Sequence, residues 1–145
     1  MKRVYLDTNV FIYAVGSASR YRDPCRQILS SVVEGQLNGE TSVYTIQEVA
    51  RQRHRRGDEN PTKRAREVAA MCTAVHHLDA GIVVRALDAV DRFTGLEVSD
   101  AIHAATALTH GLSEVVSADS DFDRVPGIER VDPLDGARLT ALMSD

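Results

Sequence analysis

Four acidic residues stand where the sequence could bring their carboxylates to one place: Asp7, Glu48, Asp100 and Asp119. Asp7 and Asp119 each follow a short apolar run, whereas Glu48 and Asp100 lie near the start of segments with helical spacing. Two carboxylates about 4 Å apart repel by about 4 kcal/mol at an effective dielectric constant of about 20, so a shared site needs a compensating cation. Oxygen ligands favour Mg²⁺ or Mn²⁺, and no cluster of His and Cys residues indicates zinc. These residues therefore predict metal-dependent chemistry.

Each of the four acids also has an ordinary structural explanation. Asp7 could only cap the helix that follows it, because Asp is a preferred N-cap residue. Glu48 lies three residues after Thr45, which is the spacing of a capping box. Asp100 could be an acid of a first helical turn, and Asp119 could form an Asx turn after a strand. The metal-site hypothesis depends on all four acids reaching the same edge of a sheet.

Other polar residues near these acids are secondary candidates. His103 lies one helical turn after Asp100, and we expect it to be packed or hydrogen-bonded, with bracing the site or touching substrate as the alternative. Asp121 and Asp123 are expected to be loop acids, although Asp121 could reach a metal ion through a water molecule. His76 and His77 are expected to stabilise a helix end or to be exposed.

Strand-like and helix-like segments alternate along the chain, which is typical of an α/β protein with a mainly parallel sheet. The pattern predicts strands near residues 3–6, 41–44, 75–78, 115–117 and 128–131. It predicts helices near 10–15, 24–37, 45–53, 62–72, 80–92, 99–110 and 134–143, with Asn38 and Gly39 ending the second helix. Ligands in such sheets bind beyond the carboxyl ends of the strands, and the four acids would fall there.

The helices expected at 45–53 and 62–72 form a helical hairpin that projects from the sheet and has a basic tip. Residues 51–66 contain seven basic and two acidic side chains, a local charge of +5 in a chain whose net charge is −4. The basic residues are Arg51, Arg53, Arg55, Arg56, Lys63, Arg64 and Arg66. A basic projection beside an acidic site predicts a surface that follows nucleic-acid phosphates, and an ordinary solvated surface is the alternative.

Length and composition fit one domain spanning residues 1–145, with no internal boundary. Hydrophobic residues make up 43% of the chain, which is enough to form a core. No apolar run approaches the roughly 20 residues of a membrane helix, and the start lacks the features of a secretory signal. Cys25 and Cys72 have no zinc-type spacing and are expected to be buried, reduced thiols. We therefore expect a cytoplasmic protein without a membrane partner.

Four motifs in this order and spacing resemble the PIN-domain ribonucleases, and most closely the VapC-type toxins of bacterial toxin–antitoxin pairs. The motifs are Asp7-Thr8-Asn9-Val10-Phe11, Glu48 after Tyr44-Thr45-Ile46-Gln47, Ser99-Asp100-Ala101-Ile102-His103-Ala104-Ala105, and Ser117-Ala118-Asp119-Ser120-Asp121-Phe122. The resemblance spans essentially the whole chain and implies a three-layer α/β/α fold. It assigns the acidic site to Asp7, Glu48, Asp100 and Asp119, with Asp121 as a variable extra acid. It also implies that Ser117 supports Asp7 and that Asn9 lies beside it.

The resemblance further implies an endoribonuclease that uses one or two Mg²⁺ or Mn²⁺ ions to activate water and leaves a 5′-phosphate. The implied metal ligands are Asp7, Glu48, Asp100, Asp119 and Asp121. The RNA-binding residues would be Arg51, Arg53, Arg55, Arg56, Lys63 and Arg64, with Arg66 as a further backbone contact. The implied partners are RNA, a second copy of the chain in a homodimer, and a VapB-type antitoxin. The C-terminal segment of that antitoxin would occupy the groove and could present an arginine to the carboxylates.

Alternative functions are distinguished by particular residues. A PIN-domain nuclease of RNA processing would share the site, and a small adjacent antitoxin gene would favour the toxin. A phosphatase with an aspartyl nucleophile needs a second acid two residues after the first, where this chain has Asn9. A receiver-like phosphoacceptor module needs a lysine after a late strand, and Val131-Asp132-Pro133 supplies none. A non-catalytic RNA-binding module would not need all four acids.

Overall fold

The computed structural model describes residues 2–144; Met1 and Asp145, which the predicted domain includes, lie outside them. The strands are β1 (Arg3–Leu6), β2 (Asn38–Ser42), β3 (Ala74–His76), β4 (Glu114–Val116) and β5 (Glu129–Val131). The helices are α1 (Thr8–Val15), α2 (Arg22–Val33), α3 (Val43–Arg55), α4 (Pro61–Met71), α5 (Ala80–Arg92), α6 (Val98–Thr109), the 3₁₀ helix η1 (Ser120–Arg124) and α7 (Gly136–Ser144).

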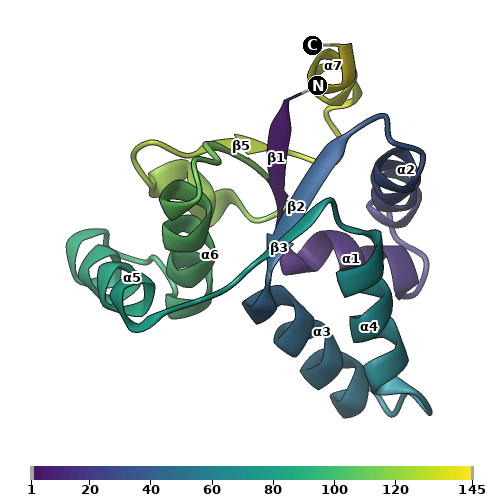
Figure 1. Ribbon diagram of the computed structural model, residues 1–145, viewed down its shortest axis with the longest axis horizontal. Helices are drawn as coiled ribbons and strands as arrows, with labels where there is room; N and C mark the ends of the chain where they lie inside the picture. The colour runs from purple at the N-terminus through teal and green to yellow at the C-terminus, as the bar shows by residue number, and fades with distance from the viewer. Residues whose placement is uncertain (1, 145) are drawn as a thin grey trace.

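The five strands form one sheet in the order β3-β2-β1-β4-β5, and every neighbouring pair is parallel. Helices α1 to α4 lie on one side of this sheet, and α5 and α6 lie on the other (Figure 1). Helices α3 and α4 form a hairpin that extends away from the sheet (Figure 1). The predicted three-layer α/β/α fold and its helical hairpin are therefore confirmed.

The buried residues of β1 alternate between two hydrophobic cores, because successive side chains of a strand point to opposite faces. Val4 and Leu6 pack with residues of α1, α2, α3, α4 and α7. Tyr5 packs with residues of α5, α6 and η1. The central strand is thus covered on both faces, as expected for a parallel sheet, and its carboxyl end at Asp7 is held from both sides.

Asn38 and Gly39 were predicted to end the second helix, but they begin β2. A Cβ atom on Gly39 would lie 2.5 Å from Cγ2 of Val32 and 2.8 Å from Cδ1 of Leu6. Glycine is therefore required at this position so that α2 can pack closely on the sheet. The polar composition of β2, whose sequence is NGETS, concealed the strand.

The predicted capping box at Thr45 and Glu48 is wrong. Helix α3 begins at Val43, with Ser42 at its N-cap position, so Glu48 lies in the second turn. The reason is that β2 ends at Ser42, which is its last residue paired with β3. At the other end of the chain, α7 begins at Gly136 instead of Leu134, because the Asp132 side chain accepts a hydrogen bond from the Leu134 backbone and holds it in a turn.

Neither cysteine forms a disulfide: Cys25 is buried in α2, and Cys72 is half-buried at the end of α4. Burial raises the pKa of both thiols to about 12, and for Cys25 the nearby Asp132 adds to the shift. Both thiols are therefore protonated and unreactive near neutral pH. In the described part of the chain, residues 2–144, no helix has the length and apolar character needed to cross a membrane.

Candidate active site

Asp7 lies at the carboxyl end of β1, where it caps α1 and is almost fully buried, with 4% of its surface exposed. Its Oδ1 accepts a 2.7 Å hydrogen bond from the backbone of Thr8, and its Oδ2 accepts a 2.7 Å bond from the Ser117 hydroxyl. The Asn9 side-chain amide donates to Ser117 Oγ at 2.9 Å. Burial raises the pKa of Asp7, although the charge of His103 and the Ser117 hydrogen bond oppose that shift. Asp7 is therefore both the N-cap of α1 and one of the four predicted site acids.

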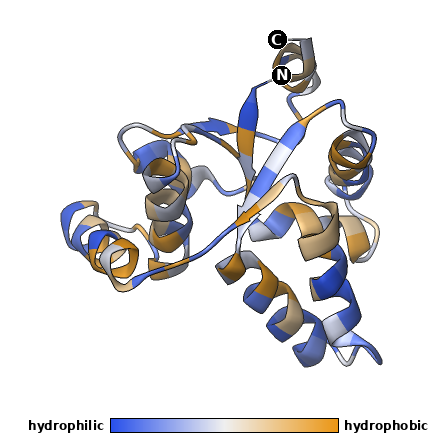
Figure 2. Cartoon of the chain, viewed as in Figure 1, coloured by the Kyte–Doolittle hydropathy of each residue, from blue (hydrophilic) through white to orange (hydrophobic). Residues whose placement is uncertain are grey.

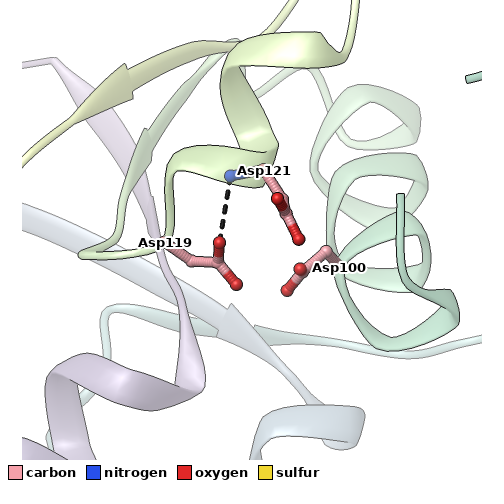
Figure 3. Close-up of side chains that lie close together, drawn as sticks. All are labelled: Asp100, Asp119 and Asp121. Atoms are coloured by element: carbon pink, nitrogen blue, oxygen red, sulfur yellow. Dashed lines mark hydrogen bonds between the residues drawn. The ribbon is translucent and has the colours of Figure 1, made fainter. Parts of the chain in front are cut away.

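Three further acids gather beside Asp7. Asp100 lies in the first turn of α6, Asp119 follows β4, and Asp121 lies in η1. One carboxylate oxygen from each lies within 4.8 Å of the others, and their side chains point toward a common space (Figure 3). The backbone of Asp121 donates to Asp119 Oδ1 at 2.9 Å, which is the predicted Asx turn. Within residues 2–144, this trio is the one group of three or more His, Cys, Asp or Glu side chains at that spacing.

The environment of Asp100 disfavours its ionised form. Burial, the hydrogen bond to the Asp119 carboxyl, and the negative charges of Asp119 and Asp7 raise its pKa from 3.8 to about 8. Near neutral pH this carboxyl therefore keeps a proton unless a cation replaces it. The all-oxygen trio that contains Asp100 fits a divalent cation, since binding such an ion would release that proton.

Glu48 reaches the same region from α3, but its oxygens are already hydrogen-bonded. Oε1 accepts from Thr8 Oγ1 at 2.6 Å and from His103 Nε2 at 2.6 Å, and Oε2 accepts from Ser99 Oγ at 2.8 Å. Burial alone would raise the pKa of Glu48, yet the hydrogen bonds and the charge of His103 bring it below its usual value. Glu48 is therefore ionised and held in one position.

His103 is buried, with 1% of its surface exposed, and is held through both ring nitrogens. Nε2 bonds to Glu48, while Nδ1 lies 2.7 Å from the Tyr5 hydroxyl, which lies 2.8 Å from Ser42 Oγ. Burial lowers the pKa of His103, but Tyr5, Asp7 and Glu48 more than compensate and hold it well above 6.5. A protonated ring that donates from both nitrogens satisfies this arrangement. The expectation of a hydrogen-bonded histidine is confirmed.

A cavity of ≈ 490 Å³ joins these residues. It is lined by Asp7, Thr8, Asn9, Ile12, Tyr13, Glu48, Arg56, Glu97, Ser99, Asp100 and Asp119. All four predicted acids thus open into one space at the carboxyl edge of the sheet. The roles of Thr8, Ser99 and Tyr5 in holding Glu48 and His103 were not predicted. Thr8 and Ser99 are each adjacent in sequence to a site aspartate, and that adjacency was the available signal.

The basic residues of the hairpin differ in their surroundings. Hydrophilic residues dominate the ends of α3 and α4 that lie far from the sheet (Figure 2). Arg53 is paired with Asp58 through a 3.2 Å contact from Nε, and Arg64 lies 3.4 Å from Glu67. Of the seven basic residues between Arg51 and Arg66, Arg56 is the one that lines the acidic cavity. Arg56 is therefore the residue through which the basic tip borders the acidic cavity.

Comparison with known protein sequences gives consistent matches. The family model described as PIN domain matches residues 4–128. The chain is 31% identical over 145 residues to Ribonuclease VapC7 of Mycobacterium tuberculosis, an alignment that covers 98% of this chain and 99% of that protein. It is 27% identical over 131 residues to Ribonuclease VapC13 of the same organism, covering 88% of this chain and 98% of the relative.

Solved structures share the fold. The crystal structure of Mycobacterium tuberculosis VapC20, described as a sarcin-ricin loop cleaving toxin, matches with a TM-score of 0.69 and 16% identity, covering 83% of this chain and 92% of that one. A toxin–antitoxin complex from Klebsiella pneumoniae matches with a TM-score of 0.66 and 23% identity, covering 90% of this chain and 97% of that one. At these identities the likeness establishes the three-layer architecture, while the sequence relatives establish the family.

Proposed function

The chain belongs to the PIN-domain family and, within it, to the VapC-type ribonuclease toxins of toxin–antitoxin systems, and from this premise we propose that it is a Mg²⁺- or Mn²⁺-dependent endoribonuclease. The observation that carries the proposal is the meeting of Asp7, Asp100 and Asp119 in one cavity. The ionised forms of Asp7 and Asp100 are disfavoured there in the absence of a cation. Acids buried together at such cost indicate a cationic ligand.

The proposed reaction is hydrolysis of an RNA phosphodiester bond by water. Asp7, Asp100 and Asp119 would hold the cation, with Asp121 in reach, and the ion would supply Lewis-acid activation of water and neutralise charge on the phosphate. Water adds its oxygen to phosphorus and the P–O3′ bond breaks, so the products carry a 5′-phosphate and a 3′-hydroxyl. Ser117 and the backbone of Thr8 orient the Asp7 carboxylate for this task.

We assign Glu48 a role in the catalytic site alongside the aspartates. A carboxylate can accept about four hydrogen bonds, and the three that Glu48 accepts leave capacity for one more. This count supports a role in which Glu48 accepts a hydrogen bond from a water molecule in the cavity, beside the aspartates that would hold the cation. His103, Thr8 and Ser99 would keep Glu48 ionised and aimed at that water.

The proposed partners follow from charge. RNA would approach along the basic residues of the hairpin, with Arg56 nearest the acids. An antitoxin segment that inserts an arginine among the carboxylates would inhibit the enzyme by charge pairing, and one of the structural relatives is a toxin–antitoxin complex. We also propose a homodimer of single-domain subunits that acts in the cytoplasm.

The test is cleavage of RNA by the purified chain. We expect cleavage with Mg²⁺ or Mn²⁺, none with excess chelator, and fragments whose 5′ ends are ligation-competent phosphates. Mapping these ends in cells after brief expression would identify the RNA. Undiminished cleavage in chelator, or fragments ending in 2′,3′-cyclic phosphates, would contradict the proposal.

A further inference from the structure

A second cavity, of ≈ 310 Å³, adjoins the acidic one. It lies between the end of α1, the loop that follows, and the last turns of α3, and both cavities are lined by Ile12, Tyr13 and Arg56. Its volume is near the lower end of the roughly 300–1,000 Å³ of small-molecule sites. A substrate lying in the acidic cavity could therefore extend into this one past Arg56.

Gln52 lines this second cavity, and one polar atom of its side chain lacks a hydrogen bond. Its Oε1 is buried and has no partner among the described residues. An unpartnered buried polar atom is costly, because folding removes its bonds to water without replacing them. A ligand that donates a hydrogen bond to this oxygen would remove that cost, and the same amide carries two N–H donors for the ligand's acceptors.

The remaining lining indicates which ligand fits. Arg53 is fixed by its ion pair with Asp58, and Arg56 is exposed between the two cavities, so two cations face this space. Tyr13 offers an aromatic ring that is already stacked on Tyr21, with 4.8 Å between ring centroids. Cations, an aromatic surface and a free amide match the phosphate, the base face and the base edge of an unpaired nucleotide.

We propose that this cavity is a nucleotide subsite next to the scissile bond. Gln52 reads the edge of the base, the Tyr13 ring supports its face, and Arg56 holds the phosphate between the two cavities. The proposal rests on the proposed function, because it places an RNA strand across the acids. It adds a specificity-determining residue, Gln52, which does not line the acidic cavity.

The test compares base preference in two variants of α3. Short single-stranded oligoribonucleotides, each with A, C, G or U at one position beside a fixed cleavage site, are cleaved by wild type, Gln52→Leu and Gln47→Leu. Gln47 is an exposed residue of the same helix and serves as the matched control. We expect wild type to prefer one base at one position, Gln52→Leu to lose about fivefold or more of that preference, and Gln47→Leu to keep it.

A binding measurement separates the subsite from catalysis. The same oligoribonucleotides are titrated into Asp7→Asn and into Asp7→Asn/Gln52→Leu, with fluorescence anisotropy as the readout. A base preference that Asp7→Asn shows and the double variant lacks supports the subsite even if no RNA is cleaved. Identical base profiles with and without Gln52, in cleavage or in binding, would overturn it, whereas absence of cleavage by wild type alone would count against the proposed nuclease.

Discussion

The Nε2 atom of His103 lies 2.6 Å from Glu48 Oε1, so the acidic cavity is built against a buried cation of the protein's own. The same nitrogen lies 3.4 Å from Asp7 Oδ1. The imidazolium thus partly compensates two of the four acids without any bound cation. The other two, Asp100 and Asp119, lack such a partner within hydrogen-bond reach among the described residues, and burial together with the neighbouring carboxylates raises the pKa of Asp100 to about 8.

Replacing His103 with alanine should destabilise the protein strongly. Breaking a buried ion pair by removing one partner costs about 3–5 kcal/mol, because the other charge is left uncompensated. Urea unfolding monitored by circular dichroism measures the change in the free energy of unfolding. His54→Ala, at an exposed position of α3, is the control and should stay within about 0.5 kcal/mol of wild type. A loss below about 1 kcal/mol for His103→Ala would contradict the buried pair.

The ion pair between Glu48 and His103 is expected to contribute fully to the free energy of unfolding only within a window of pH. The pKa of Glu48 is lowered from 4.5, so its contribution is present above that value and is lost as pH falls through the folded-state pKa. The pKa of His103 is raised from 6.5, so its contribution is present below that value and is lost as pH rises through the folded-state pKa. The stability difference between wild type and His103→Ala should therefore be largest between pH 4.5 and pH 6.5, the ordinary pKa values of the two side chains.

Asp100 predicts that the metal-free protein becomes less stable as pH rises. Its pKa rises from 3.8 to about 8 on folding, so the folded state holds more protons across that range and stability falls as pH rises. Thermal unfolding in chelator should show a loss from pH 5 to pH 8 of more than about 1.4 kcal/mol, which corresponds to one unit of pKa.

Asp100→Asn should reduce that loss, whereas Asp88→Asn, at an exposed position of α5, should not. Added Mg²⁺ should stabilise wild type most at pH 8, where binding displaces the fewest protons. An equal slope of stability against pH in wild type and Asp100→Asn would rule out Asp100 as the source.

Much of the site was predictable because it follows the order of the elements. Asp7 and Asp119 come just after parallel strands, and such strand ends share one edge of a sheet. Asp100 and His103 are three residues apart, so a helix places them on one face. The alternation of strands and helices was enough to bring these residues together without any knowledge of side-chain contacts.

The capping of α3 and the start of β2 were not predictable in the same way. The sequence of β2 has a polar composition and a glycine, and its identity as a strand depends on Val32 and Leu6 packing against Gly39 from distant segments. Likewise, the hydrogen bonds of Glu48 to Thr8, His103 and Ser99 join three segments, and no local pattern encodes such contacts.

Asp7→Asn should leave a folded protein that does not cleave RNA. Asn is also a good N-cap, so α1 should keep its start, and removing a buried charge whose pKa is raised should not lower stability near neutral pH. Ser117→Ala, which removes the donor to Asp7 together with the acceptor of the Asn9 side chain and of the Asp119 backbone, should reduce kcat/KM by about 10- to 100-fold, as loss of a group that orients a metal ligand does. Mn²⁺ binding by calorimetry should weaken in both variants. Wild-type cleavage by Asp7→Asn would exclude Asp7 from the site.

Arg56 should contribute more to RNA binding than its neighbours, because it borders both cavities whereas Arg55 borders neither. In an Asp7→Asn background that prevents cleavage, Arg56→Ala should weaken binding of single-stranded RNA. It should also reduce the slope of log K against log salt by about 0.7, the value for one phosphate contact to a single strand. Arg55→Ala is the matched control, one residue away and also exposed. Equal slopes for the two variants would mean that the hairpin acts only through its overall charge.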